Sequence, residues 1–160
     1  LICLTLTAIF ITIDLFSKKM VAGIMDSRAN EPITIIPGLL DIESSFNTGV
    51  AFGLFSELSP VMLFVPTILV IAVLIYVFFR LEMNFYRAVS ISLIAGGAIG
   101  NAVDRISAGK VYDFIDVYIG NYHWPTFNAA DCFIVAGVIL ILIEQLREVK
   151  NETKNRIHTN

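Results

Sequence analysis

The sequence contains few charged residues, few cysteines and few histidines. Only 16% of its 160 residues are Asp, Glu, Lys or Arg, whereas about one quarter is usual for a soluble domain. Two cysteines, Cys3 and Cys132, are too few for a disulfide framework. His123, the histidine outside the C-terminal region, has no Cys or Glu cluster beside it, so we expect no zinc, no other metal and no cofactor. No basic cluster indicates nucleic-acid binding, and we expect none.

Apolar residues, by contrast, are abundant and lie in long runs. They make up 56% of the chain, and the mean hydropathy is +0.77. Val61–Phe79 carries no charged residue, over a length close to the ~20 residues that a membrane-spanning helix needs. Segments 1–13, 88–103 and 132–143 reach that length when a few polar residues at one end are included. We therefore predict an all-α integral membrane protein, a four-transmembrane-helix bundle in a single domain.

The first apolar segment is expected to remain in the mature protein. It lacks a basic leader and a small-residue cleavage site, and it continues into Asp14 rather than into a mature domain. Because the sequence begins with Leu1 rather than Met, we expect further cytoplasmic residues before it.

Alternation of the four helices across the bilayer places the acidic residues on one face. Asp14 should close the first helix, Asp104 should close the third, and Asp131 should open the fourth. Six basic residues fall on the opposite face; the five on the acidic face are spread over much more chain. The density of positive charge therefore places both termini in the cytoplasm and the acids outside. The two cysteines would lie near opposite faces without a bond between them, and the outer interface would hold Tyr118, Tyr122 and Trp124.

The predicted boundaries divide the chain into seven parts. Helices are expected at about 1–20, 60–80, 86–106 and 127–146, an extracytoplasmic segment at 24–58, an outer loop at 107–126 and a cytoplasmic tail at 147–160. In the third helix, Gly96, Gly97 and Gly100 allow another helix to approach closely.

The extracytoplasmic segment has strand and turn signals. Ile33–Ile36 and Leu39–Phe46 predict two strands of a small β-sheet, joined by a tight turn at Pro37-Gly38. Gly49–Phe55 is small and aromatic and predicts a short helix on the bilayer surface. Asn47, just before it, either makes a functional contact beside glycines that permit close backbone approach or shapes a turn.

Two carboxylic acids, Asp113 and Asp131, lie at the start of the last apolar stretch. A carboxylate within a membrane helix costs about 3 kcal/mol or more, so such residues are usually functional. Two carboxyl groups a few ångströms apart share a proton, and one can activate water while the other polarises a carbonyl. In the structural alternative, Asn128 caps the last helix with Asp131 at its third position, and Asp113 is a solvated loop residue.

The remaining polar residues also allow two interpretations. Asn101, Asp104 and Arg105 share one helix face. Asp104, near a helix C-terminus, needs a cation that Arg105 or Lys18 can supply, and we favour a structural ion-pair network here over direct catalysis. Asp14 and Lys18, four residues apart, form either a surface pair or a substrate contact.

Five short motifs occur in a fixed order along the chain. They are the D-x-x-x-K of Asp14–Lys18, NTGVAFG from Asn47, GNAVDR from Gly100, VYDF around Asp113 and FNAAD around Asp131. Together they resemble the lipoprotein signal peptidases (type II signal peptidases) of bacteria, from the first predicted helix through the fourth. The chain departs from that family at Leu15, where Gln is usual, and at Cys132, where Ser is common.

The resemblance implies a four-helix aspartic protease of the bacterial cytoplasmic membrane. It would cleave the signal peptide from diacylglyceryl-modified prolipoproteins immediately before the lipidated cysteine, with Asp113 and Asp131 as the catalytic dyad. Positions that match the family's polar surround of the dyad are Asp14, Lys18, Asn47, Asn101, Asp104, Arg105 and Asn128. The predicted strands would form a cradle over the substrate lipid. The expected partners are prolipoproteins, membrane lipids and globomycin-like inhibitors, and we expect a monomer.

Two other classes of function are consistent with the composition. Intramembrane acids also mark ion paths, so a proton- or cation-conducting protein is the first alternative. Conduction predicts polar groups along the full depth of the bundle, whereas the acids of this chain crowd one face. A scaffolding membrane subunit is the second alternative, and it predicts that conservative changes at Asp113 leave activity intact.

Overall fold

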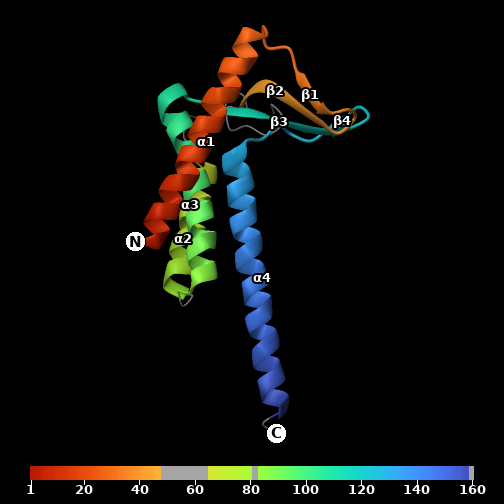
Figure 1. The fold of residues 1–160 in the computed structure, drawn as a ribbon. Helices are drawn as coiled ribbons and strands as arrows, with labels where there is room; N and C mark the ends of the chain where they lie inside the picture. The colour runs from red at the N-terminus through yellow and green to blue at the C-terminus, as the bar shows by residue number, and fades with distance from the viewer. Residues whose placement is uncertain (48–64, 81–82, 159–160) are drawn as a thin grey trace.

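In the part of the chain that the structure describes, four helices form a bundle, and a small antiparallel sheet lies at one end of it (Figure 1). The computed structural model describes residues 1–47, 65–80 and 83–158. The helices are α1 (Ile2–Ser27), α2 (Val65–Arg80), α3 (Phe85–Ala108) and α4 (Ala129–His158). The strands are β1 (Ile33–Ile36), β2 (Leu40–Asn47), β3 (Val111–Ile119) and β4 (Tyr122–His123), and they pair in that order as antiparallel neighbours.

The first hairpin agrees closely with the prediction. β1 has the predicted bounds, and β2 is shifted by one residue at each end. Leu39 N–H donates to Ile36 O at 3.0 Å across the turn, and Gly38 adopts a positive φ of 79°. Glycine favours this turn because it adopts a positive φ without steric cost. The predicted surface helix at Gly49–Phe55 lies outside the described residues.

The structure differs from the predicted boundaries at three places. The predicted outer loop, 107–126, contains β3 and β4. Its residues Val111–Ile119 are rich in β-branched and aromatic side chains, which suit a strand, and β2 supplies hydrogen-bonding partners. Asp14 does not close α1, which continues to Ser27. The predicted tail is helical as far as His158.

Glycines on α3 and α4 allow the helices to pack closely, as predicted for α3. The helix α3 is central and contacts α1, α2 and α4. A Cβ atom at Gly96 would lie 2.5 Å from Phe10 Cβ on α1, and one at Gly97 would overlap Ala130 O on α4. On α4, a Cβ atom at Gly137 would lie 2.7 Å from Ser90 O. Small residues at these positions therefore set the helix spacing.

A cluster of charged residues joins α3 to α4 at the end of the bundle away from the sheet. Asn84 caps α3 by accepting a hydrogen bond from Arg87 N–H at 3.0 Å. The buried Arg87 pairs with Glu144 at 3.2 Å and with Glu148 at 2.5 Å. Sequence analysis did not identify this cluster, because its partners are about 60 residues apart in the chain.

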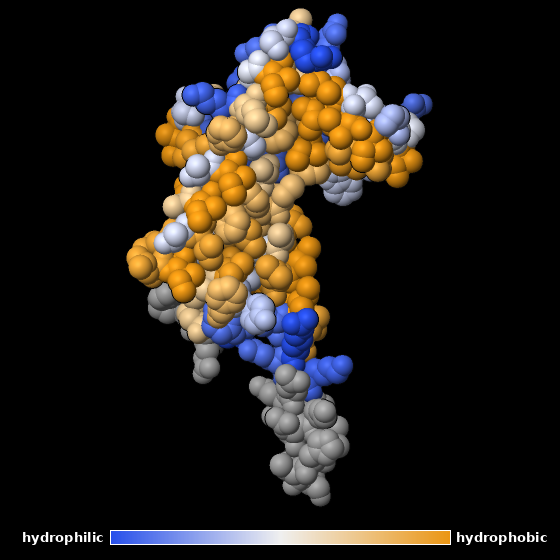
Figure 2. Space-filling view, in the orientation of Figure 1, coloured by the Kyte–Doolittle hydropathy of each residue, from blue (hydrophilic) through white to orange (hydrophobic). Residues whose placement is uncertain are grey.

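The exposed surface of the helices is largely apolar. Figure 2 shows hydrophobic residues over the helices and hydrophilic ones toward both ends of the bundle. Among the helices that the structure describes, the segment Ala129–Lys150 is the one with the length and hydropathy to cross a membrane. Exposed apolar side chains occur along the other helices too, including Ile9, Phe16, Ile68 and Ile99. This surface suits lipid better than water.

The sheet packs against the second half of α1. Val21 and Met25 of α1 form a core cluster with Phe114 of β3, and Ile33, Ile42, Tyr112 and Ile115 pack around it. Because Phe114 follows Asp113 directly in the chain, this cluster holds Asp113 in a defined position along the axis of α1.

We predict that Gly137→Ala destabilises the protein and that Gly23→Ala does not. The added methyl at position 137 meets backbone Ser90 O and Ile94 Cγ1, whereas no atom of the described residues lies within 4 Å of a Cβ atom at Gly23. Overpacking of this kind costs about 1–3 kcal/mol, and alanine in a helix gains roughly 0.5–1 kcal/mol over glycine. Thermal unfolding in detergent measures both; an equal melting temperature for Gly137→Ala and the wild type would contradict the tight α3–α4 contact.

Candidate active site

Asp113 is a buried residue of β3 and not a solvated loop residue. It is 1% exposed. The pairing of β2 with β3 shifts between Ile42 and Ser45, and Ser45 is the residue opposite Asp113, so a bulge lies beside it. Bulges change the direction in which a strand presents its side chains. Phe127 O also accepts hydrogen bonds from Phe114 N–H and Ile115 N–H at 3.0 and 2.8 Å, which brings the segment before α4 against β3.

Asp131 and Asn128 form a reciprocal cap at the start of α4. Asp131 N–H donates to Asn128 Oδ1 at 3.1 Å, and Asn128 N–H donates to Asp131 Oδ2 at 3.2 Å. This is a capping box, in which two otherwise unpaired backbone donors are satisfied. The capping geometry predicted as the structural alternative is therefore present. It occupies one oxygen of Asp131, so the other remains for further contacts.

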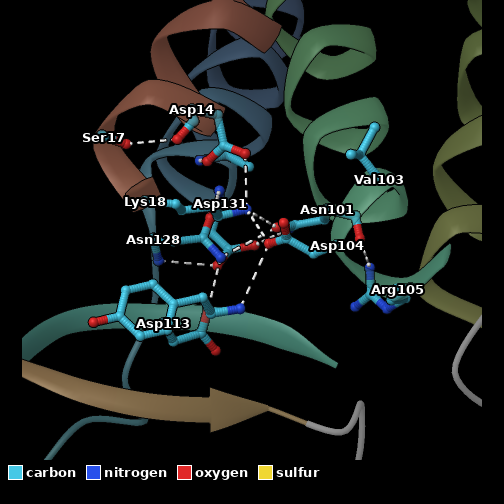
Figure 3. Close-up of polar contacts among 12 residues, drawn as sticks. Asp14, Ser17, Lys18, Asn101, Val103, Asp104, Arg105, Asp113, Asn128 and Asp131 are labelled. Carbon is cyan, nitrogen blue, oxygen red and sulfur yellow. Dashed lines mark hydrogen bonds and ion pairs between the residues drawn. The ribbon is translucent and has the colours of Figure 1, made fainter. Parts of the chain in front are cut away.

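Two asparagine side chains connect Asp113 with Asp131 (Figure 3). Asn128 Nδ2 donates to Asp113 Oδ1 at 2.6 Å and to Asn101 Oδ1 at 3.1 Å. Asn101 Nδ2 in turn donates to Asp131 Oδ1 at 2.8 Å. The two carboxyl groups, 18 positions apart in the sequence, thus share Asn128 as a direct partner. The structure brings them together at one end of the bundle.

Lys18 lies at the centre of the remaining polar residues. Its ammonium group contacts Asp14 Oδ2 at 2.7 Å, Asp104 Oδ2 at 2.8 Å and Asn101 Oδ1 at 2.9 Å. The cation that Asp104 needs is therefore Lys18. Asp14 and Lys18 are 0% and 5% exposed, so the proposed surface pair is wrong and the pair is internal.

Asp14 also binds the backbone of α4. Its Oδ1 accepts from Ala130 N–H at 2.9 Å, which satisfies a further donor at the helix start. Gly100 of α3 makes room for this carboxylate, because a Cβ atom there would overlap Asp14 Oδ2. The helices α1, α3 and α4 therefore meet here, through Asp14, Gly100 and Ala130.

Arg105 and Asn47 complete the predicted set. Arg105 Nη1 donates to Asn101 O at 3.4 Å, and the guanidinium interacts electrostatically with Asp131, Asp113 and Asp104. The side chain of Asn47, the last residue of β2, hydrogen-bonds to the Asp113 carboxylate. All nine predicted site residues therefore belong to one connected polar cluster.

The pKa of Asp113 is raised from its usual value to about 6, and burial is the largest cause. The negative charge of Asp131 contributes to this rise, while the hydrogen bonds from Asn47 and Asn128 and the charge of Lys18 oppose it. A proton is thus held on Asp113 at a pH where an ordinary aspartate is ionised. Because the folded pKa lies above the unfolded one, the contribution of this group to stability falls as pH rises from about 4 to 6.

A second polar cluster on the sheet is separate from this site. His123 Nδ1 pairs with Asp116 Oδ2 at 2.7 Å, and the His123 ring stacks on Tyr118 at 4.9 Å. In the described parts of the chain, no group of three His, Cys, Asp or Glu residues is arranged to hold a metal ion. Cys3 and Cys132 are both free.

Solved structures with a similar fold include bacterial membrane enzymes. One, described as a bacterial membrane enzyme, matches with a TM-score of 0.76 and 35% identity, over 93% of this chain and 90% of that one. A second has a TM-score of 0.74 and 34% identity, over 90% and 92% of the two chains. The fold is therefore that of a bacterial membrane enzyme.

Sequence comparison identifies the family. The family model for signal peptidase (SPase) II matches residues 6–147. The lipoprotein signal peptidases of Staphylococcus aureus strains JH9 and Newman are each 37% identical over 154 residues, 95% of this chain and 93% of theirs. The chain belongs to the signal peptidase II family, and it is thus a membrane protease of lipoprotein processing.

We predict that Asp131→Asn lowers the pKa of Asp113 below about 6, because it removes the negative charge that raises it. Infrared spectroscopy of the ¹³C-aspartate-labelled protein follows the protonated carboxyl band across a pH titration. Asp116→Asn, on the same strand but hydrogen-bonded to His123, is the matched control and should leave the titration unchanged. An unchanged Asp113 pKa in Asp131→Asn would show that the two carboxyl groups do not interact.

Proposed function

We propose that this chain is an intramembrane aspartic endopeptidase that removes signal peptides from diacylglyceryl-modified prolipoproteins, immediately before the lipidated cysteine. The observation that carries the proposal is the pairing of Asp113 and Asp131 on the shared Asn128. The names of the staphylococcal relatives, which are lipoprotein signal peptidases, support prolipoproteins as the substrate class.

The reaction proposed for this pair needs a water molecule and one proton shared by the two acids. Asp131, ionised at a helix N-terminus, removes a proton from the water as its oxygen attacks the scissile carbonyl carbon. Asp113 donates its proton to the carbonyl oxygen, which gives a neutral tetrahedral intermediate. Asp113 takes that proton back as the intermediate collapses, and Asp131 passes its newly gained proton to the leaving amine. Both acids regain their starting states.

The charge balance of the site supports a proton on the pair. Four carboxyl groups, on Asp14, Asp104, Asp113 and Asp131, face two cations, Lys18 and Arg105. Lys18 contacts Asp14 and Asp104 directly. Two further ionised carboxylates beside Arg105 alone would leave uncompensated buried charge, which is costly. Protonation of Asp113 reduces that excess.

The lengths of the helices are consistent with the proposal that they cross the bilayer. The described helices are 26, 16, 24 and 30 residues long, and a residue rises about 1.5 Å along a helix. We propose that all four span the membrane, with both termini in the cytoplasm and the site at the outer face. There the diacylglyceryl group would anchor the scissile bond at the depth of Asp131. Globomycin-like cyclic peptides would compete for the same place, and a monomer suffices for the chemistry.

The arrangement of polar groups favours proteolysis over ion conduction. On the central helix α3, no residue between Ser92 and Asn101 has a polar side chain. The buried ionic clusters occupy the two ends of the bundle. An ion path needs polar groups through the intervening depth.

We predict that the purified protein cleaves a lipidated prolipoprotein peptide and leaves its non-lipidated twin intact. Asp113→Asn and Asp131→Asn should each abolish cleavage, by 10³-fold or more as an order-of-magnitude estimate, because each removes one of two groups that act as a unit. Mass spectrometry of the products locates the cleaved bond, and circular dichroism checks folding.

Asp116→Asn is the matched control for both variants. It removes a buried carboxylate from the same strand, three residues from Asp113, and should cleave at the wild-type rate. Full turnover by either dyad variant would rule out the proposed mechanism. Ion uptake into vesicles without proteolysis would support conduction instead.

A further inference from the structure

Lys18 makes three polar contacts from a site that is almost closed to solvent. Its side chain is 5% exposed, and its ammonium group donates to Asp14, Asp104 and Asn101 at 2.7 to 2.9 Å. An ammonium group has three N–H donors and no acceptor. All three are therefore used, and the group is held in a single orientation.

The contact with Asn101 determines which way that side-chain amide points. The two ends of an asparagine amide are nearly the same size, but one accepts hydrogen bonds and the other donates them. Lys18 can only donate, so Asn101 presents Oδ1 to it at 2.9 Å. The NH₂ group of Asn101 is then directed at Asp131 Oδ1, 2.8 Å away. A flipped amide would place an NH₂ group against the ammonium and a carbonyl oxygen against the carboxylate.

The orientation of Asn128 is linked to the same oxygen atom. Asn128 Nδ2 donates to Asn101 Oδ1 at 3.1 Å as well as to Asp113 Oδ1 at 2.6 Å. Its own Oδ1 accepts from Asp131 N–H at 3.1 Å. One lysine thus sets a series of hydrogen bonds that ends on both carboxyl groups of the proposed dyad.

We propose that Lys18 is a positioning residue for catalysis: it fixes the amides of Asn101 and Asn128 so that their N–H groups point at Asp131 and Asp113. This inference rests on the proposed function and adds a role for Lys18 to it. Lys18 itself touches neither acid of the dyad through any hydrogen bond that joins the described residues. Its positioning effect passes through Asn101, in addition to the positive charge that it places near Asp113.

A double-mutant cycle between Lys18→Met and Asn101→Ala tests the inference. Methionine keeps the length of the side chain and removes the charge and the donors. We expect Lys18→Met to lower kcat on the lipidated peptide by about 10- to 100-fold, the usual effect of losing a group that orients a reactive side chain. If Lys18 acts through Asn101, the double variant should be no slower than Asn101→Ala alone. Single-turnover assays with enzyme in excess keep the low rates measurable.

Additive losses in the double variant would overturn the inference, because they would mean that Lys18 acts independently of Asn101. Lys19→Met is the matched control: the neighbouring side chain is exposed, and kcat should stay at the wild-type value. If Lys18→Met does not fold, the same cycle with Lys18→Gln decides between the outcomes. Failure of the wild type to cleave any lipidated peptide would overturn the proposed function instead.

A titration of Asp113 gives a readout that does not depend on turnover. Among the described residues, the charged groups that face Asp113 are Asp131 from α4, Lys18 from α1 and Arg105 from α3. Removing the positive charge of Lys18 should move the infrared titration of Asp113 to higher pH, and the alkaline limb of kcat/KM should move in the same direction. An unmoved titration in folded Lys18→Met would contradict the electrostatic influence of Lys18 on Asp113, whereas the double-mutant cycle decides the positioning role.

Discussion

The fold depends on the need to compensate buried charge. Asp14, Lys18 and Asp113 are each no more than 5% exposed, and an unpaired charge in such a place is very unfavourable. The pairing requirement draws α1 to α3 through Lys18 and Asp104, and α1 to α4 through Asp14 and the Ala130 backbone. The same contacts determine which helix packs against which. Apolar surfaces alone do not determine this in a membrane, because an apolar side chain contacts lipid about as favourably as it contacts another helix.

Close packing at small residues makes those contacts reachable. Gly100 leaves the space that the Asp14 carboxylate fills, and Gly97 lets α3 approach the first turn of α4. The start of α4 therefore lies within hydrogen-bonding distance of side chains from two other helices. The position of Asp131 is consequently determined by helix packing, whereas that of Asp113 is determined by the sheet and the α1 residues beneath it.

The sequence was sufficient for the features that follow local rules. The turn at Pro37-Gly38 and its two flanking strands, the small residues of α3 and the clustering of the acids at one end were all predictable from spacing and alternation. The extent of α1 was not, because a charged residue such as Asp14 normally ends an apolar helix unless distant partners compensate it.

The other features that the sequence analysis did not predict depend on contacts between segments far apart in the chain. The strand β3 adjoins an apolar run, so its two-residue alternation was not recognised, and its pairing with β2 joins residues about 70 positions apart. The bond from Lys18 to Asn101 spans 83 positions. The ion pairs of Arg87 with Glu144 and Glu148 likewise join two helices, and no local sequence pattern connects these residues.

The division of the two acids between a strand and a helix start has a consequence for biosynthesis. Asp113 leaves the ribosome before α4 exists, and Asp131 gains its place only when α4 has been inserted against α3 and α1. A partly translated chain therefore holds one isolated acid. On the proposed mechanism, a newly made molecule stays inert until its last helix has been inserted, and the translocation machinery around it is not exposed to an active protease.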